Sequence, residues 1–231
     1  MDKSYWLMLL LALLIPFLLR AQNRSSRPLG DFSRIHIVGH ADLYLSPGDS
    51  NLLVLEAGER VELDDYSSCI FGNTLYLDFE KGRQDWGLEP RITLFLTYRQ
   101  LEALHAEGKI RLKTEAPLIS ERFSLETEGF FRGKLQLQVE RLECRLEGFA
   151  QLELDGAAAT AELDFDGYGR IDAEELHARR AQATGTGMVK FKLNAEESLE
   201  ADLEGLTKLK YRGRPREKSI RKEGLTIVEK S

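Results

Sequence analysis

The sequence has few of the residues that stabilise very small domains. It contains two Cys and six Pro among 231 residues, which excludes a disulfide-rich miniprotein and a cysteine-rich zinc module. Its 19 Gly show no three-residue period, which excludes collagen. A composition of 42% hydrophobic and 30% charged residues is too apolar for a disordered chain. The length therefore indicates one large folded domain or two small ones.

Motifs that carry catalysis are also missing. The sequence has no Gly-x-Ser-x-Gly nucleophile elbow. The segment 129–134 is one residue too short for a phosphate-binding loop and lacks a Ser or Thr after its Lys. His36 and His40 share one face of a predicted strand, but no third metal ligand is evident for them. We therefore predict no catalytic residue, no cofactor and no metal ligand, and we expect that the chain is not an enzyme.

The one long apolar run lies at the N-terminus. Residues 1–21 contain Lys3, an apolar stretch of 15 residues from Tyr5 to Leu19, and Ala21 at a plausible cleavage point. A membrane-spanning helix needs about 20 apolar residues, so the run is short for one. It predicts a cleaved signal peptide over 1–21, followed by a linker over 22–30, with a retained anchor as the alternative. We expect export to the periplasm, the outer surface or the medium, without integral membrane contact after signal cleavage.

Export would place both cysteines in a compartment that permits disulfides. Cys69 and Cys144 each lie in an alternating apolar stretch. This setting favours two buried thiols that act as small hydrophobic residues. A bridge between them stays open.

The charge is distributed unevenly along the chain. Residues 206–231 carry nine Lys or Arg against three Glu, a net charge of +6, although the whole chain carries −6. The remaining body is therefore strongly acidic, which argues against nucleic acid as a partner. The basic segment 214–231 is predicted to be a terminal rung that caps the fold and blocks edge pairing. Contact with an anionic polymer or lipid surface is the alternative for these basic residues.

An internal repeat begins near residue 100. Its frame is an apolar residue, any residue, a second apolar residue, any residue and Gly. This alternation has period 2 and predicts strands with one buried face. A Gly at a fixed offset predicts a tight bend. The repeat glycines, spaced by 21, 19, 19, 18, 20 and 19 residues, are Gly108, Gly129, Gly148, Gly167, Gly185, Gly205 and, more weakly, Gly224.

The length of the repeat indicates its architecture. About 19 residues at about 3.3 Å each trace about 60 Å of chain, enough for one closed coil of short strands. A propeller blade needs about 40 residues, so propellers are excluded. Stacked coils would pair each strand with the next and enclose one continuous core. The sequence thus predicts an all-β fold, a parallel β-solenoid (β-helix) with about 19-residue rungs and a less regular N-terminal third.

The order of these motifs resembles the family named "putative auto-transporter adhesin, head GIN domain", whose members are exported proteins, mainly of Bacteroidetes. The resemblance rests on Phe32, on Ile35-His-Ile37-Val-Gly39, on Asp42-Leu43-Tyr-Leu45, and on the repeat doublets at Gly167-Tyr-Gly169 and Gly185-Thr-Gly187. It covers about residues 31–213. It implies a right-handed β-helical domain in the cell envelope, without an established activity.

One segment resembles a calcium-binding EF-hand loop. Asp164, Asp166 and Glu175 occupy positions 1, 3 and 12 of a twelve-residue loop. Position 5 is Tyr168, a poor ligand, and the Ala-rich stretch 156–161 would have to form the entering helix. The loop also falls in frame with the repeat. We therefore predict a repeat corner here, with calcium binding as the weaker alternative.

Three functions remain compatible with the sequence. Export, a repeat and the missing catalytic motifs favour a non-enzymatic binding or adhesion module for an unknown envelope glycan or protein. A purely structural envelope domain is the first alternative. The second is a carbohydrate-active β-helix enzyme, which would use paired carboxylates such as Asp155, Asp164, Asp166 and Asp172. On an acidic strand surface these carboxylates are expected simply to face water.

Overall fold

The computed structural model describes residues 23–58, 61, 63, 66–79 and 92–231. The predicted signal peptide over 1–21 lies outside the described residues. Within them the fold is all-β, as predicted, and no α-helix occurs. None of the described segments is a helix long and apolar enough to cross a membrane.

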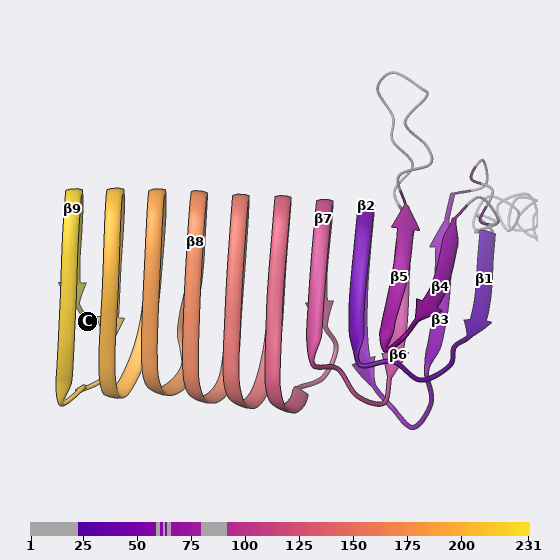
Figure 1. Ribbon diagram of the computed structural model, residues 1–231, viewed down its shortest axis with the longest axis horizontal. Coiled ribbons are helices and arrows are strands. Elements are labelled where there is room, and N and C mark those ends of the chain that lie inside the picture. The colour runs from indigo at the N-terminus through magenta and orange to yellow at the C-terminus, as the bar shows by residue number, and fades with distance from the viewer. Residues whose placement is uncertain (1–22, 59–60, 62, 64–65, 80–91) are drawn as a thin grey trace, which may run out of the picture.

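Nine strands form one sheet with a mixed topology. Seven of them follow one another in the order β1-β3-β6-β2-β7-β8-β9, while β5 pairs with β2 and β4 pairs with β5. Figure 1 shows β7, β8 and β9 along one end of the long axis and the remaining strands at the other. The strands are β1 (Asn23–Pro28), β2 (Arg34–Pro47), β3 (Leu52–Ala57), β4 (Ser67–Phe71), β5 (Thr74–Phe79), β6 (Ile92–Tyr98), β7 (Ala103–Thr114), β8 (Leu118–Arg212) and β9 (Glu217–Lys230).

The C-terminal region, residues 103–230, consists of parallel passes of the chain. β7 pairs in parallel with the start of β8, where Gly108 lies opposite Gly129. The end of β8 pairs in parallel with β9, where Gly205 lies opposite Gly224. Between them β8 runs for 95 residues of extended backbone, drawn in Figure 1 as successive side-by-side passes. The basic segment 214–231 contains β9 and forms the last of these passes.

Glycines stack on one another at a bend that recurs in every pass. Gly148 has a φ of +92°, and a Cβ there would lie 2.7 Å from the carbonyl oxygen of Gly129. Only glycine fits, because a side chain would be strained and would collide with the backbone of the preceding pass. The column runs through Gly39, Gly108, Gly129, Gly148, Gly167, Gly187, Gly205 and Gly224.

The predicted glycine series was wrong at one position. Gly185 is not in the column, and Gly187 takes its place against the carbonyl oxygen of Gly167. Gly185 is buried instead, and a Cβ there would lie 2.6 Å from the ring of Phe191. The large Phe191 side chain fills the space that a side chain at 185 would occupy. The two glycines are two residues apart, so spacing alone could not distinguish them.

Alternating side chains build one continuous core. Inward residues of β8 such as Phe123, Phe165 and Phe191 have almost no exposed surface. They belong to a single cluster of buried residues that extends from Phe32 to Tyr211. Burial of apolar surface stabilises the fold by about 25 cal/mol per Å². Each pass therefore depends on its neighbours to cover its inner face.

The N-terminal region, residues 23–98, departs from the predicted parallel arrangement. β2 does pair in parallel with β5, β6 and β7. The pairs β1–β3, β3–β6 and β4–β5 are antiparallel. The sheet is therefore mixed: β4 and β5 form a hairpin, whereas β1–β3 and β3–β6 pair strands that are not consecutive in the chain. The segment 22–30, predicted as a linker, contains β1, which occupies the edge beside β3.

Candidate functional site

An apolar stripe runs along the outside of the C-terminal region. It is formed by the residues that directly follow successive glycines of the column. Phe130, Tyr168 and Leu225 are 61%, 55% and 74% exposed. The members, which we call the apolar stripe, are Phe130, Phe149, Tyr168, Met188, Leu206 and Leu225.

Parallel register explains why these side chains lie together. Strand pairing places Leu206 opposite Leu225. The ring centroids of Phe130 and Phe149 are 5.4 Å apart, and those of Phe149 and Tyr168 are 5.6 Å apart. Because every pass bends at the same glycine, the following residue points outward at the same place each time. A repeated residue type in the sequence thus becomes a line on the surface.

A row of basic residues borders the apolar stripe. It occupies the position two residues further along the pass, where Gln151 and Ile227 interrupt it. Within the described part of the chain, Arg132 and Lys190 have no ion-pair partner, whereas Arg170 lies 3.6 Å from Glu153 and Lys208 lies 2.7 Å from Glu229. The members, which we call the cationic column, are Arg111, Arg132, Arg170, Lys190 and Lys208.

The C-terminal members of the apolar stripe and of the cationic column line one open groove. Its volume is about 720 Å³. Tyr168, Met188 and Leu206 contribute apolar surface, and Arg170 and Lys190 contribute charge. The groove can therefore receive a molecule that carries an apolar chain beside an anionic group.

Acidic residues lie on the opposite side of the glycine column. They precede the glycines by one residue, are exposed, and make no ion pair among the described residues. The face is consequently divided into an acidic and a basic half, with the apolar stripe on the basic side. An anion that approaches this face is directed toward the cationic column. The acidic residues are Glu128, Glu147, Asp166, Glu204 and Glu223.

The three residues of the calcium-loop motif do not form a metal-binding group in the described part of the chain. Asp164, Asp166 and Glu175 lie within β8, so no helices flank the loop. Asp164 and Asp166 are exposed, and Glu175 lies 3.1 Å from Arg212. Asp172 accepts a 2.6 Å hydrogen bond from Lys192, which raises the pKa of Lys192. The segment is part of a pass that includes the positive-φ glycines Gly167 and Gly169.

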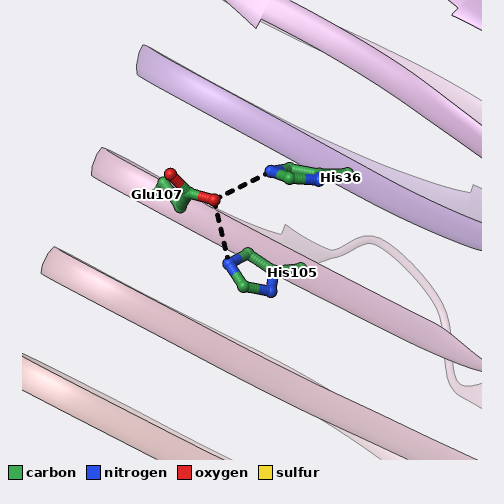
Figure 2. A group of neighbouring side chains, drawn as sticks. All are labelled: His36, His105 and Glu107. Atoms are coloured by element: carbon green, nitrogen blue, oxygen red, sulfur yellow. Dashed lines mark hydrogen bonds and ion pairs between the residues drawn. The ribbon is translucent and has the colours of Figure 1, made fainter.

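His36 does have a histidine neighbour, but it is not His40. Register places His36 opposite His105, with ring centroids 4.8 Å apart. Figure 2 shows both rings beside Glu107, a residue that our sequence reasoning did not consider. These three are the residues of the described chain whose metal-binding atoms come close together. A signal was available, because His36 and His105 each precede a column glycine by three residues.

The two cysteines are free and differ in exposure. Cys144 is buried, as predicted, and burial raises the pKa of its thiol well above the usual range. Cys69 is exposed in β4, so the prediction of two buried thiols was wrong for this residue. The alternation around Cys69 predicts one buried face of the strand but does not say which face it is. The antiparallel hairpin of β4 and β5 decides this and leaves Cys69 on the exposed face.

The class that this fold defines is an all-β domain with an outward-facing groove. The sequence profile of the family described as "Putative auto-transporter adhesin, head GIN domain" matches residues 31–215. The chain therefore belongs to this family, as the motif order predicted. A search of curated proteins found no match.

Solved structures of similar fold come from species of Bacteroides and Parabacteroides. A "putative adhesin" from Bacteroides fragilis is 22% identical, with a TM-score of 0.85 over 92% of this chain and 98% of that one. A "putative adhesin" from Parabacteroides distasonis is 16% identical, with a TM-score of 0.73 over 91% and 97%. A "Putative lipid binding protein" from the same species is 21% identical, with a TM-score of 0.70 over 91% and 96%. These similarities show the shared fold.

Proposed function

We propose that this chain is an exported, non-enzymatic, adhesion-type binding module of the cell envelope. Membership of an adhesin family and the apolar segment 1–21 support this proposal. We also propose that residues 103–230 form a right-handed β-solenoid with about 19 residues per turn. The parallel pairing of β7, β8 and β9 and the stacked glycines support that architecture.

The apolar stripe beside the cationic column carries the functional proposal. We propose that its ligand is an anionic amphiphile, a phospholipid of the envelope, with the apolar chain on the stripe and the phosphate on the basic residues. Arg132 and Lys190 have no ion-pair partner in the described chain and can accept a phosphate without breaking a salt bridge. The groove places Lys190 beside exposed Met188 and Leu206.

The geometry of the aromatic rings favours a lipid over a sugar. Sugars bind aromatic side chains by stacking on an open ring face. Here Phe149 lies between the rings of Phe130 and Tyr168, at interplanar angles of 32° and 27°, so its two faces are occupied by neighbouring rings. A row of adjoining rings continued by flexible Met and Leu side chains suits an extended hydrocarbon chain. A structural neighbour described as a "Putative lipid binding protein" agrees with this ligand class.

The proposal is tested by flotation of the purified full-length protein with phosphatidylcholine vesicles, with and without phosphatidylglycerol. We expect binding to the anionic vesicles that weakens as salt screens the cationic column. F149S combined with L206S should weaken binding at least about tenfold, equivalent to about 1.4 kcal/mol. R170Q combined with K190Q should remove the preference for anionic lipid. Every variant keeps residues 1–21, so this segment contributes equally throughout.

Matched controls separate the groove from general surface properties. Ile119 is 71% exposed and lies outside the apolar stripe, so I119S should bind as the wild type does. Arg179 is exposed outside the cationic column, so R179Q should also be neutral. Equal vesicle binding by F149S/L206S and the wild type would refute the lipid assignment. If the protein instead binds an envelope glycan or protein, and the stripe variants weaken that binding, the chain is a binding module with a different ligand. Turnover of a polysaccharide by the purified protein would overturn the non-enzymatic proposal.

A further inference from the structure

A row of polar side chains crosses the first passes at one position of the frame. Parallel register places His36 of β2 opposite Tyr76 of β5 on one side and His105 of β7 on the other. Glu126 of β8 lies opposite His105 in turn. Glu107 lies two residues after His105 and therefore on the same face of β7. Three strands, β2, β7 and β8, thus bring two imidazoles and two carboxylates together.

The two imidazoles direct their Nε2 atoms at the same carboxylate oxygen. Nε2 of His36 lies 2.9 Å from Oε1 of Glu107, and Nε2 of His105 lies 3.2 Å from it. Figure 2 shows this convergence, with Glu107 beside both rings. A tetrahedral ion with bonds of about 2.0 Å holds neighbouring ligand atoms about 3.3 Å apart. The two distances are close to that separation, and all three ligand atoms lie within 4.8 Å of one another.

Hydrogen bonding alone leaves one imidazole nitrogen unsatisfied. His36 and Glu107 form a hydrogen bond, but Nε2 of His105 is buried and has no hydrogen-bond partner among the described residues. Its 3.2 Å approach to Glu107 lacks the geometry of a hydrogen bond. A buried polar atom without a partner is costly. A cation bound between the three atoms would accept the lone pair of each nitrogen and would be balanced by the charge of the carboxylate.

Glu126 supports this role for His105. Its Oε2 lies 3.4 Å from Nδ1, on the other side of the ring from Glu107. A carboxylate beside Nδ1 favours the tautomer with a proton on Nδ1 and a lone pair on Nε2. Arg145 in turn lies 3.2 Å from Glu126 and helps to fix its position. The arrangement is a ligand histidine with an orienting carboxylate behind it.

We infer that His36, His105 and Glu107 form a binding site for a divalent first-row transition-metal ion, with Zn²⁺ as the preferred occupant. Two imidazole nitrogens exclude Ca²⁺ and Mg²⁺, which select oxygen ligands. Two His and one Glu form a known three-ligand set that leaves a fourth position for water or an external ligand. His36 and His105 line a groove of about 1230 Å³, through which such a ligand can reach the ion. The site is separate from the apolar stripe.

Zinc binding can be measured directly on the full-length protein, purified without a polyhistidine tag and stripped with a chelator. We expect one Zn²⁺ per chain after loading and desalting, together with a raised melting temperature. E107Q and H36Q should each lose affinity by at least about tenfold, and E126Q by about tenfold. Co²⁺ in place of Zn²⁺ should give the visible absorption of a four-coordinate site in the wild type and lose it in E107Q.

Two further measurements keep the inference open to refutation. H177Q is the matched control, because His177 is exposed and far along the chain in β8, and its zinc stoichiometry should equal that of the wild type. Melting curves without metal identify any variant that fails to fold, and such a variant is replaced by the conservative E107D. No zinc retained by the wild type, or equal affinity in wild type, E107Q and H36Q, would overturn the site. Vesicle binding does not enter this test, so its outcome is independent of the proposed function.

Discussion

The two regions of the molecule pair their strands in different ways. In the C-terminal region each residue lies beside the residue at the same position of the preceding pass, as Gly205 lies beside Gly224. In the N-terminal region antiparallel pairs bring unlike residues together, as Cys69 lies opposite Tyr76. β2 belongs to both, because it pairs with β7 on one side and with β5 and β6 on the other. Parallel stacking therefore converts a sequence repeat into surface columns, and antiparallel pairing does not.

This difference determines where function can be encoded. A column extends one kind of side chain over many passes, which suits a long ligand such as an acyl chain. The metal site lies instead where β2, the first strand of the parallel stack, meets β7, and it needs three specific residues. We expect the two regions to differ in core packing, backbone, buried polar groups and surface charge, in decreasing order of effect.

The largest effect is expected in the core of the C-terminal region. Phe165 has no exposed surface, so F165A should lower the free energy of unfolding by about 3–5 kcal/mol. Chemical denaturation followed by circular dichroism measures the loss. Because each pass depends on its neighbours, we also expect the C-terminal region to unfold separately in this variant. A loss below about 1 kcal/mol would show that the passes tolerate a cavity and would contradict nearest-neighbour packing.

The glycine column should be more sensitive than a glycine in a hairpin. G148A should lower the free energy of unfolding by about 3 kcal/mol, because strain at a φ of +92° adds to a collision with Gly129. Gly72 of the β4–β5 hairpin has a φ of +60° but open space around it, so G72A should cost about 1 kcal/mol. Paired denaturation curves give both values. Equal losses would mean that backbone stacking contributes nothing beyond the strain.

A buried hydroxyl should make the N-terminal region sensitive to alkaline pH. Burial raises the pKa of Tyr98 to about 12, above the usual value of 10. The folded state then holds its proton longer than the unfolded state, so stability is full below pH 10 and falls by about 1.4 kcal/mol per unit from pH 10 to 12. The Tyr98 hydroxyl has no hydrogen-bond partner among the described residues, so Y98F should gain about 1 kcal/mol at neutral pH.

The measurement is the free energy of unfolding of both proteins as a function of pH. Y98F should lack the part of the alkaline decline that Tyr98 causes. Tyr168 is 55% exposed, so Y168F serves as a control that retains the wild-type decline. Identical pH profiles for Y98F and the wild type would show that Tyr98 ionises as readily in the folded protein as in the unfolded one.

Surface ion pairs should differ least between the regions. Arg221 and Asp202 lie 3.0 Å apart across β8 and β9, and Arg24 and Glu56 lie 3.4 Å apart across β1 and β3. All are at least partly exposed, so D202N and E56Q should each change the free energy of unfolding by about 0.5 kcal/mol or less. Double-mutant cycles measure the pair energies. A pair energy above about 1 kcal/mol in only one region would assign part of the regional difference to surface charge.

The sequence by itself determined the strands, the glycine bends and the continuous core of the C-terminal region. Alternation and repeat spacing are local properties, and residues such as Leu163 and Phe165 point inward wherever the pass lies. The family could be recognised for the same reason, since its motifs are short and ordered. The apolar stripe was also present in the printed residues after each glycine, although only stacking shows that they form one line.

Only the tertiary structure decided the features that depend on the register between distant strands. Whether Gly185 or Gly187 joined the column depended on how Phe191 fills the interior. The metal ligands needed the pairing of β2 with β7, which joins His36 to residues about 70 positions away. The antiparallel pairing of β4 with β5 placed Cys69 on an exposed face. Contacts of this kind are set by which edges meet, and alternation within one strand carries no information about its partner.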